Sequence, residues 1–158
     1  MRRTAYPYLE VGRLVNAPPQ AVWDVLTDTW QWVRWGPSIS VVQCAERYIR
    51  RGSRGRVRTF FGLWLPFVIN DFEFGRWSWQ VAGFPATGHR VDPAGKNSSL
   101  LMFQVPVFAA PYLLMCKIAV DRIARMAERT GIESGRLPGR NPRIYHEEHQ
   151  AYELHEER

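Results

Sequence analysis

The sequence of 158 residues is poor in the residue types that carry much of covalent and redox chemistry. It has two cysteines, Cys44 and Cys116, which lie far apart and therefore form no CxxC pair. This spacing favours two reduced, buried thiols in a cytoplasmic protein. The sequence also has no glycine-rich phosphate loop, and no serine, histidine and aspartate at a spacing that would support a catalytic triad.

A long uninterrupted hydrophobic run is missing as well. The longest apolar stretch, residues 100–116, is broken by Gln104, Pro106 and Pro111, so it predicts a strand, a turn and the start of a helix rather than a membrane span. The basic residues Met1–Thr4 are not followed by the apolar segment of a secretory signal. We therefore expect a cytoplasmic protein, and its length fits one domain.

Lysine is scarce, since Lys96 and Lys117 are the only two, and nearly all positive charge is arginine. Residues 1–130 hold 17 Arg and Lys against 9 Asp and Glu, whereas residues 131–158 hold 4 against 6. An excess of this kind attracts anionic partners but does not determine a fold.

One dense arginine cluster stands out. It comprises six residues within a span of twelve: Arg47, Arg50, Arg51, Arg54, Arg56 and Arg58. A surface interaction with an anionic partner, such as a membrane surface, stays open on this evidence. Nucleic acid is a poorer fit, because its binders interleave charge with exposed aromatics and only Tyr48 and Phe60 qualify. We favour a solvated hairpin.

Aromatic residues are abundant: they make up 13% of the chain and include seven tryptophans. Large aromatic side chains fill cores, but they also line pockets for apolar or ring-shaped ligands. Both interpretations stay open from composition alone.

The hydrophobic periodicity predicts an α+β protein. Pro18 and Pro19 open a short helix, and a second helical turn ends at Gly36–Pro37. Strands are predicted over residues 6–15, 39–45, 56–61, 63–74, 77–82, 87–92 and 98–105. The period then changes, and a long amphipathic helix is predicted over residues 111–129, ending at Gly131. Strands joined by short turns form an antiparallel meander, which needs a helix to cover one face.

This element order resembles the START/polyketide-cyclase superfamily, also called SRPBCC, over about residues 6–130. The resemblance rests on the opening segment NAPPQAVWDVLTDTWQWVRWGP, on GSRGRVRTFFG, on FEFGRWSWQVAGFPATGHRV and on the closing amphipathic helix. It implies a helix-grip fold, in which a curved antiparallel sheet of about seven strands wraps around a long C-terminal helix. It also implies an apolar cavity between sheet and helix. The superfamily includes lipid carriers, hormone and allergen-type binders, aromatase/cyclases and activators of chaperones.

The predicted inner faces supply candidate ligand-binding residues. His89 is the only histidine before the C-terminal segment, and Trp77 and Trp79 share one face of a strand. The full set of candidates is Trp35, Phe61, Trp77, Trp79, His89, Phe103, Tyr112 and Met115. The preferred hypothesis is a binding protein for a small hydrophobic or aromatic ligand, such as a lipid, a polyketide or a quinone-like molecule. The alternative is a polyketide cyclase/dehydrase-type enzyme that uses His89 as its acid/base.

Residues 131–158 are predicted to be a polar C-terminal tail, with Asn141–Pro142 as a candidate helix start, that follows a domain of residues 1–130. His146, His149 and His155 lie in this tail, where the first two have a spacing that would suit a metal on a helix. Adventitious composition is the favoured interpretation, so no metal and no cofactor are predicted. The oligomeric state is left open.

Overall fold

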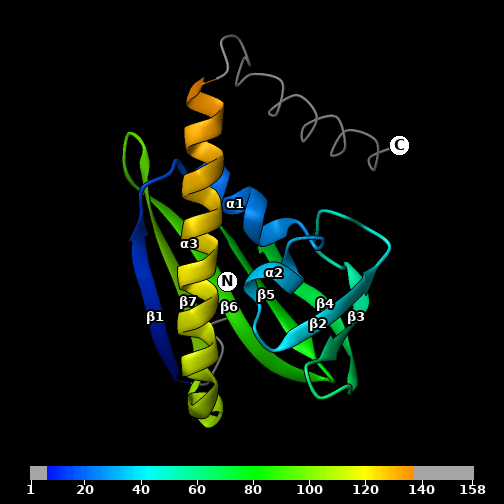
Figure 1. Cartoon of the computed structure of the whole chain (residues 1–158). Coiled ribbons are helices and arrows are strands. Elements are labelled where there is room, and N and C mark those ends of the chain that lie inside the picture. The colour runs from blue at the N-terminus through cyan, green and yellow to red at the C-terminus, as the bar shows by residue number, and fades with distance from the viewer. Residues whose placement is uncertain (1–6, 137–158) are drawn as a thin grey trace, which may run out of the picture.

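A computed structural model describes residues 7–136 of the chain, with side chains described up to residue 130 (Figure 1). Seven strands and three helices follow one another with a short 3-10 helix, η1, before the last of them. The elements are β1 (Tyr8–Val15), α1 (Pro19–Thr27), α2 (Trp32–Trp35), β2 (Ile39–Cys44), β3 (Arg54–Thr59), β4 (Trp64–Glu73), β5 (Arg76–Val81), β6 (Phe84–Gly95), β7 (Ser98–Pro106), η1 (Val107–Tyr112) and α3 (Leu113–Arg136).

All seven strands form one antiparallel sheet in the order β1-β7-β6-β5-β4-β3-β2. The sheet curves, and α3 runs along its inner side while α1 and α2 lie beside α3 over the remaining strands (Figure 1). The predicted α+β fold class with a helix-grip arrangement is confirmed. The helices cover one face of the sheet, and the other face meets water. Because side chains alternate along each strand, every second residue points toward the helices.

The inner face of the sheet is rich in large apolar side chains. On β5, Trp77 and Trp79 point inward and are at most 9% exposed, whereas Arg76 is exposed. On β7, Leu101, Phe103 and Val105 alternate inward in the same way. The clear period-2 pattern of these two strands is therefore the pattern of a one-sided sheet.

Trp32 of α2 fills much of the hollow under the curved sheet. Its side chain is fully buried and lies parallel to the Trp77 ring, with centroids 5.5 Å apart and planes 6° apart. Edge and tilted contacts to Trp79 and Phe67, at 5.3 and 5.5 Å, surround the same indole. Its Nε1 group donates a hydrogen bond to the Leu26 carbonyl oxygen at 2.9 Å, so the polar atom is satisfied within the core.

The connection between α1 and α2 is anchored to the loop before β3. The Arg47 guanidinium contacts the nearly buried Asp28 carboxylate at 2.9 Å and lies 4.0 Å from the Trp30 ring centroid. The Thr29 hydroxyl donates to backbone carbonyls of the same loop, including that of Arg47 at 2.8 Å. These contacts hold α2, and with it Trp32, at a fixed distance from the sheet.

Several predicted boundaries are wrong; the strand predicted over residues 87–92, for example, spans Phe84–Gly95. The strand predicted to reach Phe61 ends at Thr59, because Gly62 adopts φ +89° and closes a turn in which the Thr59 amide donates to the Leu63 carbonyl. The last helix does not end at Gly131 but continues to Arg136. Each of the two glycines inside this helix, Gly131 and Gly135, costs only about 1 kcal/mol relative to alanine, which a helix of this length tolerates.

The position of Trp32 leads to a stability prediction. Replacing Trp32 by Ala removes a fully buried indole, so we expect the free energy of unfolding to fall by about 3–5 kcal/mol. Urea unfolding followed by circular dichroism measures the change. Trp30→Ala is the matched control, because Trp30 is two residues away and 67% exposed, and its loss is expected to cost about 1 kcal/mol or less. Equal costs for the two variants would contradict this account of the core.

Candidate functional site

A small cavity lies between the inner face of the sheet and the first turns of α3. Its volume is about 20 Å³, room for about one water molecule. The lining residues come from the end of α2 and the loop after it, from β2, β5, β6 and β7, and from η1 and α3: they are Trp35, Gly36, Pro37, Ile39, Trp79, Thr87, His89, Phe103, Tyr112, Met115, Cys116 and Ala119. A cavity is thus present where the fold predicts one, but it is far smaller than a lipid or polyketide.

The stacked tryptophans explain the small volume. Trp32 occupies the part of the hollow beneath β5, where Trp77 and Trp79 would otherwise face open space. Only the part of the hollow under the N-terminal turns of α3 is left unfilled. The apolar cavity that the family resemblance implies is therefore present, but it is little larger than a water molecule.

One hydrogen bond lies at the edge of the cavity, beside the lining residue Tyr112. The Ser38 and Tyr112 hydroxyls share it, and these residues lie in the loop after α2 and at the end of η1. Tyr112 lines the cavity and is also 39% exposed, so its ring lies between the cavity and solvent. The pair forms a closure at the end of the cavity where α3 begins, which we call the Ser38–Tyr112 latch.

His89 belongs to a chain of three hydrogen bonds in the cavity wall. Its Nδ1 atom lies 3.3 Å from the Trp77 carbonyl oxygen, and its Nε2 atom lies 3.0 Å from the Thr87 hydroxyl. Trp79 Nε1 donates to the same hydroxyl at 3.1 Å. Since a carbonyl oxygen only accepts, Nδ1 carries the proton and Nε2 accepts from Thr87. With a neutral imidazole, each polar side-chain atom in these three hydrogen bonds has a partner.

Burial sets the protonation of His89. The side chain is 2% exposed and stacks on Trp77 with ring centroids 3.7 Å apart. Desolvation lowers its pKa to about 3, against a smaller opposing effect of the hydrogen bond to the Trp77 carbonyl. At pH 7 only about one molecule in ten thousand carries a proton there, which makes His89 a poor general acid.

Cys116 supplies a thiol to the same wall from α3. It is 1% exposed, and burial raises its pKa to about 12, so the thiol is protonated and unreactive while the cavity is closed. Cys44 lies away from the cavity, on β2, where its sulfur donates weakly to the Arg54 carbonyl oxygen at 3.5 Å. The two cysteines therefore differ in accessibility, which makes Cys116 a reporter for opening of the cavity.

Six of the eight residues that the sequence predicted line this one cavity. They are Trp35, Trp79, His89, Phe103, Tyr112 and Met115. The other two do not. Trp77 faces inward as expected but is covered by Trp32 and His89, and Phe61 lies in the β3–β4 turn with 67% of its side chain exposed.

Several lining residues were not among the predicted site residues. Thr87 shares a strand face with His89, and Cys116 and Ala119 belong to the apolar stripe of the long helix, so their sequence positions did contain a signal. The pairing of Ser38 with Tyr112 had none, because two hydroxyls 74 residues apart meet only through the tertiary fold.

The arginine cluster does not form one continuous ribbon. Arg47 and Arg50 pair with Asp28 and Glu46 in the loop before β3. Arg54, Arg56 and Arg58 lie on the outer face of β3, where Arg56 covers the Trp64 ring at 4.5 Å.

Residues 7–130 contain no group of three histidine, cysteine or acidic side chains placed to hold a metal ion. None of the helices that the structure describes is both long enough and apolar enough to cross a membrane. The predicted polar tail beyond residue 136, with His146, His149 and His155, lies outside the described residues.

The family of the chain follows from its sequence over the same elements. Residues 9–130, from β1 into α3, match the family described as polyketide cyclase / dehydrase and lipid transport. The chain belongs to that family. The SRPBCC-type resemblance of the sequence is thereby confirmed, and the description covers both hydrophobic ligand binding and cyclase chemistry. No curated protein matches the chain.

Several solved structures are similar to this polyketide cyclase/dehydrase and lipid transport family member in fold. A hypothetical protein of Helicobacter pylori, jhp0584, is 12% identical with a TM-score of 0.65, over 80% of this chain and 97% of that one. The ZhuI aromatase/cyclase of Streptomyces sp. R1128 is 13% identical with a TM-score of 0.60, over 78% and 94%. Protein NE0264 of Nitrosomonas europaea is 14% identical with a TM-score of 0.60, over 81% and 98%. Identities this low show a shared fold alone.

The neutral state of His89 predicts a pH dependence of stability. The folded-state pKa of about 3 lies below the value of 6.5 for a free histidine, so between these values the unfolded chain binds more protons than the folded one. The contribution is fully present above pH 6.5 and is lost as the pH falls toward 3. From pH 7 to pH 5 we expect His89 to lower the free energy of unfolding by about 2 kcal/mol.

Urea unfolding of the wild-type protein and of His89→Gln at both pH values isolates this contribution. The glutamine variant keeps every other titrating group, so its stability should fall by about 2 kcal/mol less over the same interval. Parallel pH profiles for the two proteins would show that His89 is not held neutral in the fold.

Proposed function

We propose that this protein binds a small hydrophobic or aromatic ligand in the cavity under the N-terminal turns of α3, without chemistry of its own. The observation that carries the proposal is the convergence of six aromatic, histidine and methionine side chains on one cavity, whose edge is closed by a single hydrogen bond. Membership of a family described by lipid transport and polyketide chemistry supports the same class of ligand. Lipids, polyketides and quinone-like molecules are the classes we favour.

A cavity of about 20 Å³ is too small for any ligand of these classes, so binding requires it to widen. A ligand of two fused rings enters only if the wall moves. The contacts of each part of the wall indicate which part moves at the lowest cost in free energy. Breaking the Ser38–Tyr112 latch costs one partly exposed hydrogen bond, about 0.5–1.5 kcal/mol. Moving Trp32 or Trp77 would disrupt the fully buried core instead. Entry therefore takes place beside Tyr112.

The polar groups of the wall suit a ligand with few polar atoms. In the closed state the hydroxyl of Thr87 and the ring nitrogens of His89 are already bonded to one another or to backbone, and the Cys116 thiol is a weak donor. The Ser38 and Tyr112 hydroxyls become available when the latch opens, which places hydrogen-bonding capacity at the mouth and apolar surface further inside. A flat molecule with one hydroxyl or carbonyl group at its edge fits this distribution.

The enzyme alternative depends on His89 as acid/base. Its imidazole is neutral, fully enclosed and committed at both nitrogens, and no carboxylate lies in the described wall of the cavity to raise its pKa. The arrangement therefore supports a structural role of His89, which provides hydrogen-bond partners for Thr87 and for the Trp77 carbonyl oxygen. We favour binding over cyclase/dehydrase chemistry.

Chemical labelling of Cys116 tests the proposal. In a Cys44→Ser background, the rate of reaction with a disulfide reagent such as dithionitrobenzoate reports opening of the cavity. We expect Tyr112→Phe, which removes the latch hydroxyl, to accelerate labelling about 2–10-fold. We expect 2-naphthol, a flat two-ring probe with one hydroxyl, to slow labelling in proportion to its saturation of the protein.

A blocking variant locates the probe. Met115→Trp places a bulky ring at the half-exposed side of the cavity and should weaken 2-naphthol binding at least tenfold, measured by titration calorimetry. Arg122→Trp, on the exposed face of the same helix, is the matched control and should bind the probe as the wild type does. If saturating 2-naphthol left Cys116 labelling unchanged, or if Met115→Trp bound it normally, the proposed site would be wrong.

A further inference from the structure

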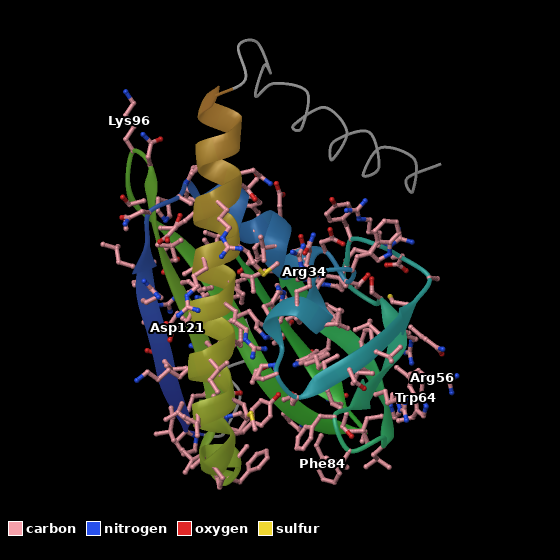
Figure 2. The ribbon with its side chains drawn as sticks, in the orientation of Figure 1. Arg34, Arg56, Trp64, Phe84, Lys96 and Asp121 are labelled. Carbon is pink, nitrogen blue, oxygen red and sulfur yellow. The ribbon has the colours of Figure 1, made fainter. Side chains whose placement is uncertain are left out.

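Exposed hydrophobic side chains gather at one end of the molecule. Of the large hydrophobic residues that are exposed in the described part of the chain, eight belong to the β3–β4 turn, to the start of β6 and to η1 with the start of α3. We call these residues the apolar rim: Phe60, Phe61, Leu63, Phe84, Val107, Phe108, Tyr112 and Leu114. The antiparallel meander brings the three segments to the same end of the sheet, and Figure 2 shows Phe84 there, opposite the Lys96 turn.

The β3–β4 and β5–β6 turns are neighbours at this end, and η1 follows β7, the strand next to β6. In the strand order β7-β6-β5-β4-β3, the β5–β6 turn lies between the β3–β4 turn and the chain that leaves β7 as η1. The Ala82 amide before Phe84 donates to the Pro66 carbonyl oxygen of β4 at 2.8 Å, which ties the first two turns together. The exposure is high: 67% for Phe61, 69% for Phe84 and 66% for Leu114. Exposed apolar side chains that gather at one end of a molecule mark an interaction site.

Charge around the apolar rim is one-sided. Within four residues of these turns, the described chain carries the cations Arg56, Arg58 and Lys117. Strand pairing also brings one carboxylate near this end, Glu10 of β1, which accepts a hydrogen bond from the Gln104 side chain at 3.0 Å. Arg56 lies over the Trp64 ring, and both lie just above the level of Phe84 (Figure 2). Apolar tips below a belt of tryptophan and arginine match the layers of an anionic lipid surface, with acyl chains beneath charged headgroups.

We propose that the apolar rim docks on the surface of an anionic lipid bilayer, with its tips in the headgroup and acyl boundary and with Arg56, Arg58 and Lys117 among the phosphates. Tyr112 belongs both to the apolar rim and to the cavity wall, so the latch faces the bilayer when the protein is docked. The docking itself does not depend on the proposed ligand binding, because it uses side chains that lie outside the cavity, apart from Tyr112.

Vesicle flotation with the full chain tests the docking. We expect binding to vesicles of phosphatidylcholine and phosphatidylglycerol at 7:3, and binding about tenfold or more weaker to phosphatidylcholine alone, since each basic residue near an anionic surface adds about fivefold in affinity. The double variant Phe61→Ser with Phe84→Ser should reduce the partition coefficient on anionic vesicles at least tenfold. Arg56→Gln with Arg58→Gln should reduce it on anionic vesicles and flatten its salt dependence.

Phe74→Ser is the matched control. Phe74 is 66% exposed, nearly the same as Phe84, but it lies in the β4–β5 turn at the opposite end of the strands. This variant should bind vesicles like the wild type. Thermal unfolding of each variant confirms that it is folded. Equal binding by Phe74→Ser and by the Phe61, Phe84 double variant would overturn the proposal.

A second outcome would also overturn it. If the wild type did not bind anionic vesicles but formed a dimer in sedimentation equilibrium that Phe61→Ser with Phe84→Ser dissociated, the apolar rim would be a contact between two copies of the chain. Titration of the same double variant with 2-naphthol keeps the two proposals separate. Normal probe binding with lost vesicle binding supports docking, and lost probe binding with normal vesicle binding contradicts the docking while implicating the turns in the cavity.

Discussion

The stacking of Trp32 under the curved sheet is the contact on which the rest of the interior depends. A sheet that bends around a helix leaves a hollow wider than the helix fills, and here one indole from α2 closes most of it by lying flat against Trp77. The Asp28–Arg47 ion pair and the Leu26 carbonyl hold α2 at the required height. A cavity of about 20 Å³ stays unfilled under the first turns of α3, lined by residues of the sheet, α2, η1 and α3.

A polar chain inside an apolar wall needs an explanation, and the neutral His89 provides one. Trp79 donates to Thr87, Thr87 donates to His89, and His89 donates to the Trp77 carbonyl oxygen. This series therefore buries no charge and leaves none of its donors without an acceptor. Such a series orients three side chains with more precision than apolar packing alone. The family description names both cyclase/dehydrase chemistry and lipid transport, and the fold alone does not choose between them.

Much of the fold was predictable because its signals are local. Alternation identified β5, the prolines at 18 and 19 identified α1, and the 3.6 period identified the long helix, all of which the structure contains. Six of eight predicted site residues meet at one cavity because inward-facing positions of neighbouring strands converge wherever a sheet curves. The failures are of two kinds. The alternating pattern continues to Phe61, but the strand ends at Thr59 because Gly62 turns the chain. The volume of the cavity depends on the position of Trp32 in the core, which no local sequence pattern encodes.

The break between β7 and α3 has a mechanical consequence. In η1 the backbone departs from helical geometry at Ala109, with φ −103° and ψ 23°, and Pro111 removes an amide donor, so the start of α3 is joined to the sheet by a segment with weak internal bonding. On the other side of the cavity, α2 is held more firmly. The indole groups of Trp32 and Trp35 donate hydrogen bonds to carbonyl oxygens of α1, and the Asp28–Arg47 ion pair anchors the segment before α2. Any widening of the interior would therefore displace the start of α3, whereas α2 with Trp32 and Trp35 would keep its position on the sheet.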